Sequence, residues 1–150
     1  MRTAFFSRTV VILCSLLLGI TVLAKEPFFE GLGSYSRKIT TDSPAAQRYF
    51  NQGLAFLHGF NHGAAIASFQ EAAHLDPKCA MAHWGTALAC GPHINLTVMP
   101  PSAVEMAWNE LKLAQQNAEH ASPVERDLIE ALSHRYANPP PQDRAPLDQA

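Results

Sequence analysis

Apolar residues recur every three or four positions through the middle of the chain, which is the spacing of a helix buried along one face. Between positions 49 and 60 two apolar stripes run side by side and predict a helix buried on a wide face. The sequence GFNHG at 59–63 then interrupts the pattern with two glycines, which is typical of a tight turn. The spacing resumes at 64–75, and Asp76-Pro77 ends this second predicted helix.

Two helices, a tight turn and a proline within about 34 residues make up the period of a tetratricopeptide repeat. Small and large residues alternate at fixed offsets in such a repeat, so that its two helices interlock. With Pro77 placed at the thirty-second position, seven of eight signature positions carry the expected type of residue. Gln52 departs from the pattern, because Leu or Ile is usual there. The matching residues are Tyr49, Gly53, Phe56, Ala65, Phe69, Ala72 and Pro77.

A second repeat is predicted directly after the first. Its first helix is expected at 79–90, where Gly91-Pro92 ends it. The connection that follows, GPHINLTVMPP, is longer than the turn of a regular repeat. Its second helix is expected at 102–119, and the spacing of Ser102 and Glu105 predicts a capping box at the start.

A third repeat starts but is not completed. Ser122, Pro123 and Glu125 again provide a cap, a first-turn proline and a capping box for a helix. Residues 138–150 read as a proline-rich linker and the start of a truncated helix. We therefore expect an all-α fold, an α-solenoid of about two and a half repeats, from a longer protein. The expected repeats are 43–78, 79–119 and the partial 122–137.

The N-terminus has the features of a secretory signal peptide. Two arginines flank a short positive region, and an apolar run of about fifteen residues follows, ending in Val22-Leu23-Ala24. We predict cleavage after Ala24, so that residues 1–24 are removed; the alternative is an uncleaved N-terminal anchor. Export would place the mature chain in the periplasm or cell envelope. Residues 25–42 carry Gly, Pro and Ser without a clear period, and we interpret them as an extended lead-in.

Charge and motifs exclude several classes of function. Without the signal peptide the 11 basic residues become 9, against 13 acidic residues, so the net charge is 9 − 13 = −4. A chain without a basic patch is a poor nucleic-acid binder, and no later segment reaches membrane-spanning length. The sequence has neither a Gly-x-Ser-x-Gly elbow nor a Gly-rich phosphate loop, so we predict no enzymatic activity and no cofactor.

Four short segments match the sequences of one group of proteins, beyond the general pattern of the repeat. They are Phe60–His62, Phe69–Ala73, Asp76–Gly85 and Gly91–Asn95. These segments are similar to the first repeats of exported bacterial tetratricopeptide-repeat proteins. The resemblance implies further repeats after Ala150, and it brings no established reaction or substrate with it. A docking arm for a longer enzyme therefore remains an alternative interpretation.

The second alternative is a metal site. Cys79 and His83 lie four residues apart, so both side chains can reach one ion, and sulfur with imidazole suits zinc or copper. His93 in the long connection is a third candidate ligand. We favour core packing over a metal site, with Cys79 as a small buried residue at the turn and His83 at the aromatic position of its repeat. If one straight helix holds Cys79 and Cys90, they lie about 16 Å apart along its axis, whereas a disulfide needs Cα atoms within roughly 7 Å. A bridge between them is therefore excluded unless the helix breaks.

Binding of a protein or peptide is the function that the sequence favours. The first helix of each tetratricopeptide repeat lines a concave groove, and here those positions are apolar and aromatic, which suits an apolar helix or peptide segment. These residues would otherwise pack against the lead-in or against later repeats. The candidate groove residues are Phe50, Leu54, Leu57, Met81, Trp84 and Leu88.

Overall fold

The computed structural model describes residues 26–149, and this part of the chain is all-α, as predicted. The predicted signal peptide lies outside the described residues. A short 3₁₀ helix, η1, follows α4. The helices are α1 (Pro44–His58), α2 (His62–Leu75), α3 (Ala80–Ala89), α4 (Pro101–Gln116), η1 (Ala118–His120), α5 (Pro123–Ser133) and α6 (Ala145–Asp148).

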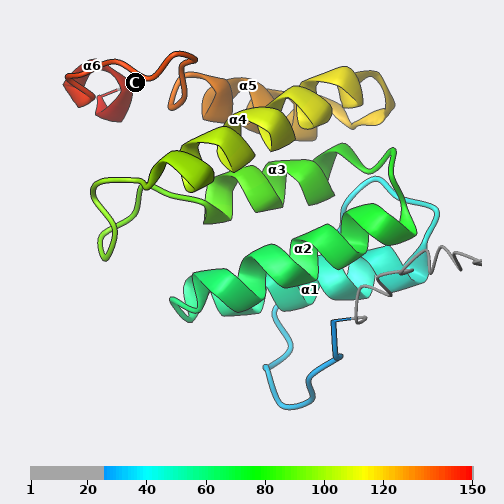
Figure 1. The fold of residues 1–150 in the computed structure, drawn as a ribbon. Helices are drawn as coiled ribbons and strands as arrows, with labels where there is room; N and C mark the ends of the chain where they lie inside the picture. The colour runs from blue at the N-terminus through cyan, green and yellow to red at the C-terminus, as the bar shows by residue number, and fades with distance from the viewer. Residues whose placement is uncertain (1–25, 150) are drawn as a thin grey trace, which may run out of the picture.

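Consecutive helices pack against one another in the order of the sequence. The most extensive contacts join α1 to α2, α2 to α3 and α3 to α4, and α5 packs against both α3 and α4. Figure 1 shows the result as a stack, with the α1–α2 pair at the bottom, α3 and α4 above it and α5 beyond α4. Alternate helices also touch, since α1 contacts α3 and α3 contacts α5.

Polar side chains cap three of these helices. Ser43 Oγ accepts a hydrogen bond from Ala46 N at 3.2 Å at the start of α1. Asn61 does the same for α2, with its Oδ1 atom 3.3 Å from Ala64 N. Ser122 and Glu125 form the predicted capping box of α5. Each cap satisfies backbone N–H groups that have no partner within the helix.

The capping box predicted at Ser102 and Glu105 is wrong. Helix α4 begins one residue earlier than expected, with Pro100 as the cap residue and no side-chain hydrogen bond to the cap. Pro101 favours this start because its ring presets a helical φ and its missing N–H would be unpaired in the first turn. Ser102 therefore lies inside the helix, where it cannot act as the cap.

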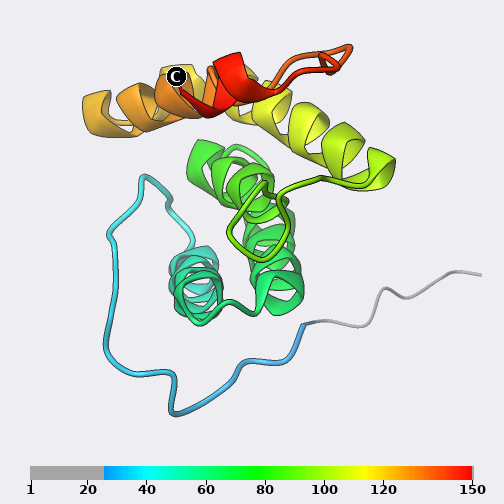
Figure 2. The same cartoon turned by 90° about the vertical axis from the view of Figure 1, so that its left-hand side faces the viewer.

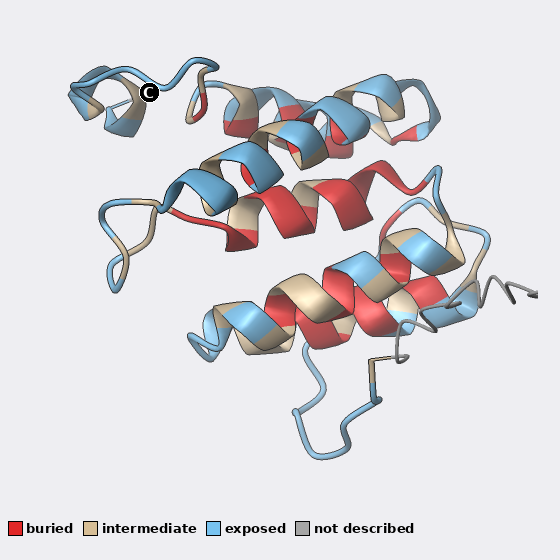
Figure 3. Ribbon diagram, in the orientation of Figure 1, coloured by how far each residue is buried: buried red, intermediate tan, exposed pale blue. Residues whose placement is uncertain are grey.

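One of the two core clusters packs around the ring of Phe69, which is completely buried. A Cβ atom added to Gly53 of α1 would lie 2.5 Å from Phe69 Cε1, and one added to Gly85 of α3 would lie 2.6 Å from Phe69 Cδ1. The ring of α2 therefore fills the space between two glycines on neighbouring helices. Figure 3 shows α3 almost entirely buried at the centre of the stack.

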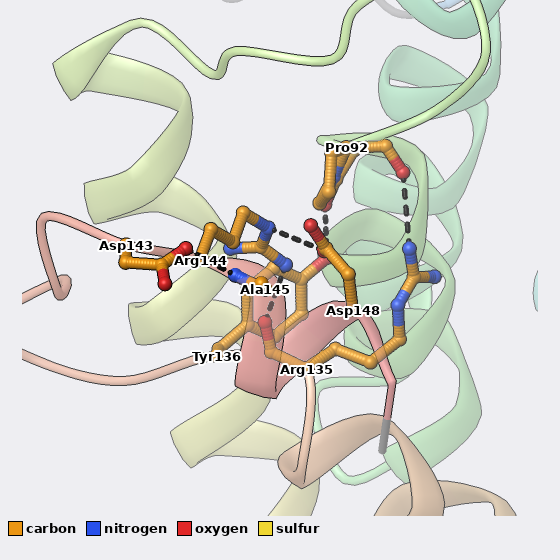
Figure 4. A network of polar contacts seen from close by, with 8 residues as sticks. Pro92, Arg135, Tyr136, Asp143, Arg144, Ala145 and Asp148 are labelled. Atoms are coloured by element: carbon orange, nitrogen blue, oxygen red, sulfur yellow. Dashed lines mark hydrogen bonds and ion pairs between the residues drawn. The ribbon is translucent and has the colours of Figure 1, made fainter.

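The segment after α5 is tied back to the end of α3. The buried Tyr136 hydroxyl lies within hydrogen-bonding distance of two backbone oxygens, that of Ala87 at 2.7 Å and that of Gly91, which share its single proton. Arg135 Nη2 donates to Pro92 O at 3.1 Å, and Arg144 Nη2 donates to Arg135 O at 2.6 Å (Figure 4). These bonds hold the proline-rich linker against the helical stack.

None of the helices within residues 26–149 combines the length and the apolar character that crossing a membrane requires.

Candidate binding surface on the first helix

The lead-in packs against two opposite flanks of α1. Residues 26–29, here called the first arm, run along one flank of the helix in the same direction as α1. Residues 37–40, the second arm, run back along the opposite flank. Figure 2 looks nearly along α1 and shows the lead-in passing around the outer side of the helix. Two stretches of extended backbone are thus held by one helix.

The first arm is bound through its backbone. Tyr49 Oη donates to Glu26 O at 2.8 Å. Gln52 Nε2 donates to Pro27 O at 3.0 Å, while Gln52 Oε1 accepts from Phe29 N at 2.8 Å. One amide side chain therefore pairs with both a carbonyl and an N–H group of the same extended segment. Such pairs recognise main chain and do not depend on the side chains of the segment.

Two aromatic side chains of the first arm add contacts of their own. Phe28 lies edge-to-face on Tyr49, with 6.0 Å between ring centroids, and Phe29 lies edge-to-face on Phe56 at 5.4 Å. The guanidinium carbon of Arg48 lies 4.1 Å from the centroid of the Phe28 ring, which places the cation over its face. Both phenylalanines remain more than two-fifths exposed, at 44% and 43%.

The second arm repeats the same use of amides. Gln47 Nε2 donates to Arg37 O at 2.8 Å, and Gln47 Oε1 accepts from Ile39 N at 2.9 Å. Asn51 Oδ1 accepts from Arg37 N at 3.2 Å and from Gln47 Nε2 at 3.0 Å. Ile39 is the one buried side chain between residues 26 and 42, and it anchors this arm in the core.

A buried carboxylate fixes the end of the second arm to α5. Glu125 Oε1 accepts from Thr40 N at 2.7 Å, and Oε2 accepts from Thr40 Oγ1 at 2.6 Å and from Ser122 N at 2.7 Å. Burial acts to raise the pKa of Glu125, but the hydrogen bonds from Thr40 and Ser122 outweigh it and hold the pKa below its usual value. The same carboxylate therefore completes the helix cap and retains the lead-in.

The sequence contained a signal for this surface. Gln52 is the position that departs from the repeat pattern, and it is 97% buried because its side chain spans from the first arm to Ser68 Oγ, at 3.1 Å. Gln47 and Asn51 are four residues apart, so they share one face of α1. Three amide side chains within six positions of a helix with an apolar core face were the available clue.

The predicted groove residues lie mostly inside the stack. Phe50, Leu54 and Met81 are core residues with exposures of 0%, 4% and 1%, so no partner reaches them in this arrangement. Leu57, Trp84 and Leu88 are partly buried and pack against the core clusters. Helix α5 covers part of this region, since Trp84 Nε1 donates to Leu128 O at 3.0 Å.

The candidate metal ligands are engaged in other contacts. Cys79 is buried, and burial raises the pKa of its thiol to about 11, so it is not a thiolate near neutral pH. His83 Nδ1 lies 2.7 Å from Glu110 Oε2, and Nε2 lies 3.2 Å from Pro77 O. Within residues 26–149 no group of three or more His, Cys, Asp or Glu side chains gathers to hold an ion.

The remaining candidate ligand, His93, and the second cysteine, Cys90, are also accounted for. His93 stacks on His62, with 3.5 Å between ring centroids and 6° between the planes, so the long connection rests on the α1–α2 turn. Partial burial and then the neighbouring His62 lower the pKa of His93. Cys79 and Cys90 are both free thiols and both buried.

A cavity of about 680 Å³ lies between the long connection, α4 and the proline-rich linker. Apolar side chains from all three elements line it, with Trp108 of α4 as the largest. Lys112 places its ammonium nitrogen 4.5 Å from the Trp108 ring centroid. This cavity lies on α4 and is separate from the surface of α1 that contacts the lead-in.

Comparison with models of protein families, with curated proteins and with solved structures finds no match to this chain.

Proposed function

We propose that this protein is an exported helical-repeat scaffold that binds an extended segment of another protein or a peptide. The main-chain recognition of the lead-in by α1 supports the proposal. Gln47, Asn51 and Gln52 together pair with carbonyl and N–H groups of two extended stretches. A helix that holds its own chain in this way has the chemistry to hold a foreign one.

Packing supports the tetratricopeptide part of the proposal. Ala65, Phe69 and Ala72 of α2 are all fully buried. The same offsets recur in α4 at Ala107, Leu111 and Ala114, which are 0%, 1% and 0% exposed. Small residues at these places let the second helix of each pair approach its neighbours closely. A solenoid of stacked helix pairs, with α5 starting a third, accounts for both sets.

Export rests on the N-terminal sequence. Recovery of the protein from the envelope fraction of its source, followed by N-terminal sequencing, tests this part directly. Lys25 as the first residue is the expected result. A chain that begins at Met1 and remains inside the cell would refute export and leave the binding proposal standing.

Selection from a displayed library of random peptides tests the binding function. We expect enriched peptides to bind the purified protein at one site, and binding to be lost in the double variant Tyr49→Phe/Gln52→Leu, which removes the hydrogen bonds to the first arm. The matched control is Gln70→Leu/Gln116→Leu, because these two exposed amides lie on α2 and α4 away from the lead-in. No enrichment over an unrelated helical protein, or an equal loss in both double variants, contradicts the proposal.

A further inference from the structure

We infer that the lead-in is a displaceable occupant of the α1 surface, and that the partner is an extended segment in which a proline precedes two aromatic residues. This inference rests on the proposed function, because it identifies the partner of that same surface. Residues 26–38 are the part that leaves, while Ile39 and Thr40 keep the chain attached to the core and to Glu125. The partner takes the places of Pro27, Phe28 and Phe29.

The chemistry of the first arm defines the partner. The hydrogen bonds of the Gln52 amide and the Tyr49 hydroxyl to the first arm all reach backbone atoms, so these bonds do not depend on the side chains of the segment. Selectivity comes from the two aromatic positions, where edge-to-face contacts on Tyr49 and Phe56 require a ring. The cation of Arg48 favours an aromatic face at the first of them. Proline suits the position before the rings, because only its carbonyl is used and its ring favours an extended backbone.

The lead-in is held weakly enough to be displaced. No side chain between residues 26 and 38 is buried, and Tyr35 at the far end is 60% exposed. The turn between the arms contains Gly31 and Gly33, both with positive φ and both with open space where a Cβ would lie. A hollow of about 360 Å³ separates this turn from α1. Segments with few buried apolar contacts open at low cost.

The tether makes the lead-in a competitor of the partner. A segment attached to the same chain is present at a high effective concentration, so it fills the site whenever no partner is bound. The apparent affinity for the partner falls in proportion to the fraction of sites that are open. Weakening the lead-in should therefore strengthen binding of an outside segment, although the binding atoms of α1 are unchanged.

A synthetic peptide with the sequence of residues 26–38, labelled with a fluorophore, is the probe. Its binding is measured by anisotropy against the natural protein and against Phe28→Ser/Phe29→Ser, which loosens the lead-in without touching the core. The control Ile94→Ser/Val98→Ser removes two apolar side chains, each 80% exposed, from the long connection. Circular dichroism of each variant verifies equal helix content. A third variant adds Gln52→Leu to Phe28→Ser/Phe29→Ser.

The loosened variant should bind the peptide at least about tenfold more tightly than the natural protein, if the site is closed nine-tenths of the time or more. The control should bind like the natural protein, and the added Gln52→Leu should abolish the gain. Equal affinity for the natural and loosened proteins, or a gain that survives Gln52→Leu, overturns the inference. A concentration-dependent dimer of the natural protein, seen by sedimentation, also overturns it, because the occupant would then be the lead-in of a second copy.

Failure of this experiment differs from failure of the proposed function. Library peptides that require Tyr49 and Gln52 would uphold a binding scaffold even if the peptide of residues 26–38 bound no variant. In that case the lead-in would be a fixed part of the fold. The absence of any library peptide would instead reject the function itself.

Discussion

The substitution Gly53→Ala tests the packing of the whole stack with one methyl group. Its Cβ would lie 2.5, 2.6 and 2.8 Å from three atoms of the Phe69 ring, closer than carbon atoms pack. The ring cannot move aside easily, because it is fully buried and faces Gly85 of α3 on its other contact surface. Phe50 lies against it as well, with 5.3 Å between ring centroids.

Two effects of opposite sign decide the result. Alanine is favoured over glycine inside a helix by roughly 0.5–1 kcal/mol. Overpacking of a well-packed core costs about 1–3 kcal/mol. The steric cost is the larger here, because Phe69 is confined by two helices, so Gly53→Ala should lower the free energy of unfolding by about 1–2 kcal/mol.

Urea unfolding followed by circular dichroism measures this change. Gly63→Ala is the matched control, since nothing lies within 4 Å of its Cβ position, and it should be neutral or stabilising by up to about 1 kcal/mol. In the background Phe69→Leu, a smaller aliphatic side chain replaces the ring, so Gly53→Ala should cost much less. The difference between the two costs of Gly53→Ala is the coupling energy of the two positions. A Gly53→Ala protein as stable as the natural one, or an equal cost in both backgrounds, would refute this packing.

Three further predictions concern titratable groups. Burial acts to lower the pKa of His83, but the hydrogen bonds that the ring donates to Glu110 Oε2 and Pro77 O outweigh it and raise the pKa. The pair therefore stabilises the fold below pH 6.5, and this gain is lost as the pH rises through the folded-state pKa. Glu110→Gln should flatten that part of the stability profile. Glu125 has a lowered pKa, so its contribution is present above the usual carboxyl range and lost as the pH falls through its folded-state value; Glu125→Gln should remove this acid dependence. Burial raises the pKa of the Cys79 and Cys90 thiols to about 11, so both should react with a thiol reagent at pH 8 only after denaturant is added. Rapid labelling of these two cysteines in the native protein would contradict their burial.

The helices could be predicted because local signals and burial agree along them. The apolar spacing indicates the buried face of each helix, Ser43 marks the start of α1, and the glycines at 59 and 63 mark the turn between α1 and α2. Gly53 was expected at a small position, and the structure shows the Phe69 ring that requires it. The start of α4 was missed by one residue, because a first-turn proline outweighed the Ser102 signal.

The binding surface was harder to predict for a physical reason. The lead-in has no apolar period, and α1 holds it chiefly through backbone atoms, which every sequence possesses. On the α1 side, the amides of Gln47, Asn51 and Gln52 mark the contact by residue type. The groove interpretation placed Phe50 and Leu54 toward a partner, whereas both are fully or almost fully buried in the stack.

Amide hydrogen exchange of the lead-in, followed residue by residue by NMR, tests the central claim most directly. The N–H groups of Phe29, Arg37, Ile39 and Thr40 donate to side chains of α1 and α5, so they should exchange more slowly than those of Glu30 and Ser34 in the exposed turn. Gln52→Leu should remove the protection of Phe29 and leave that of Thr40. Uniformly fast exchange along the lead-in would contradict the account, because α1 would then hold no extended segment.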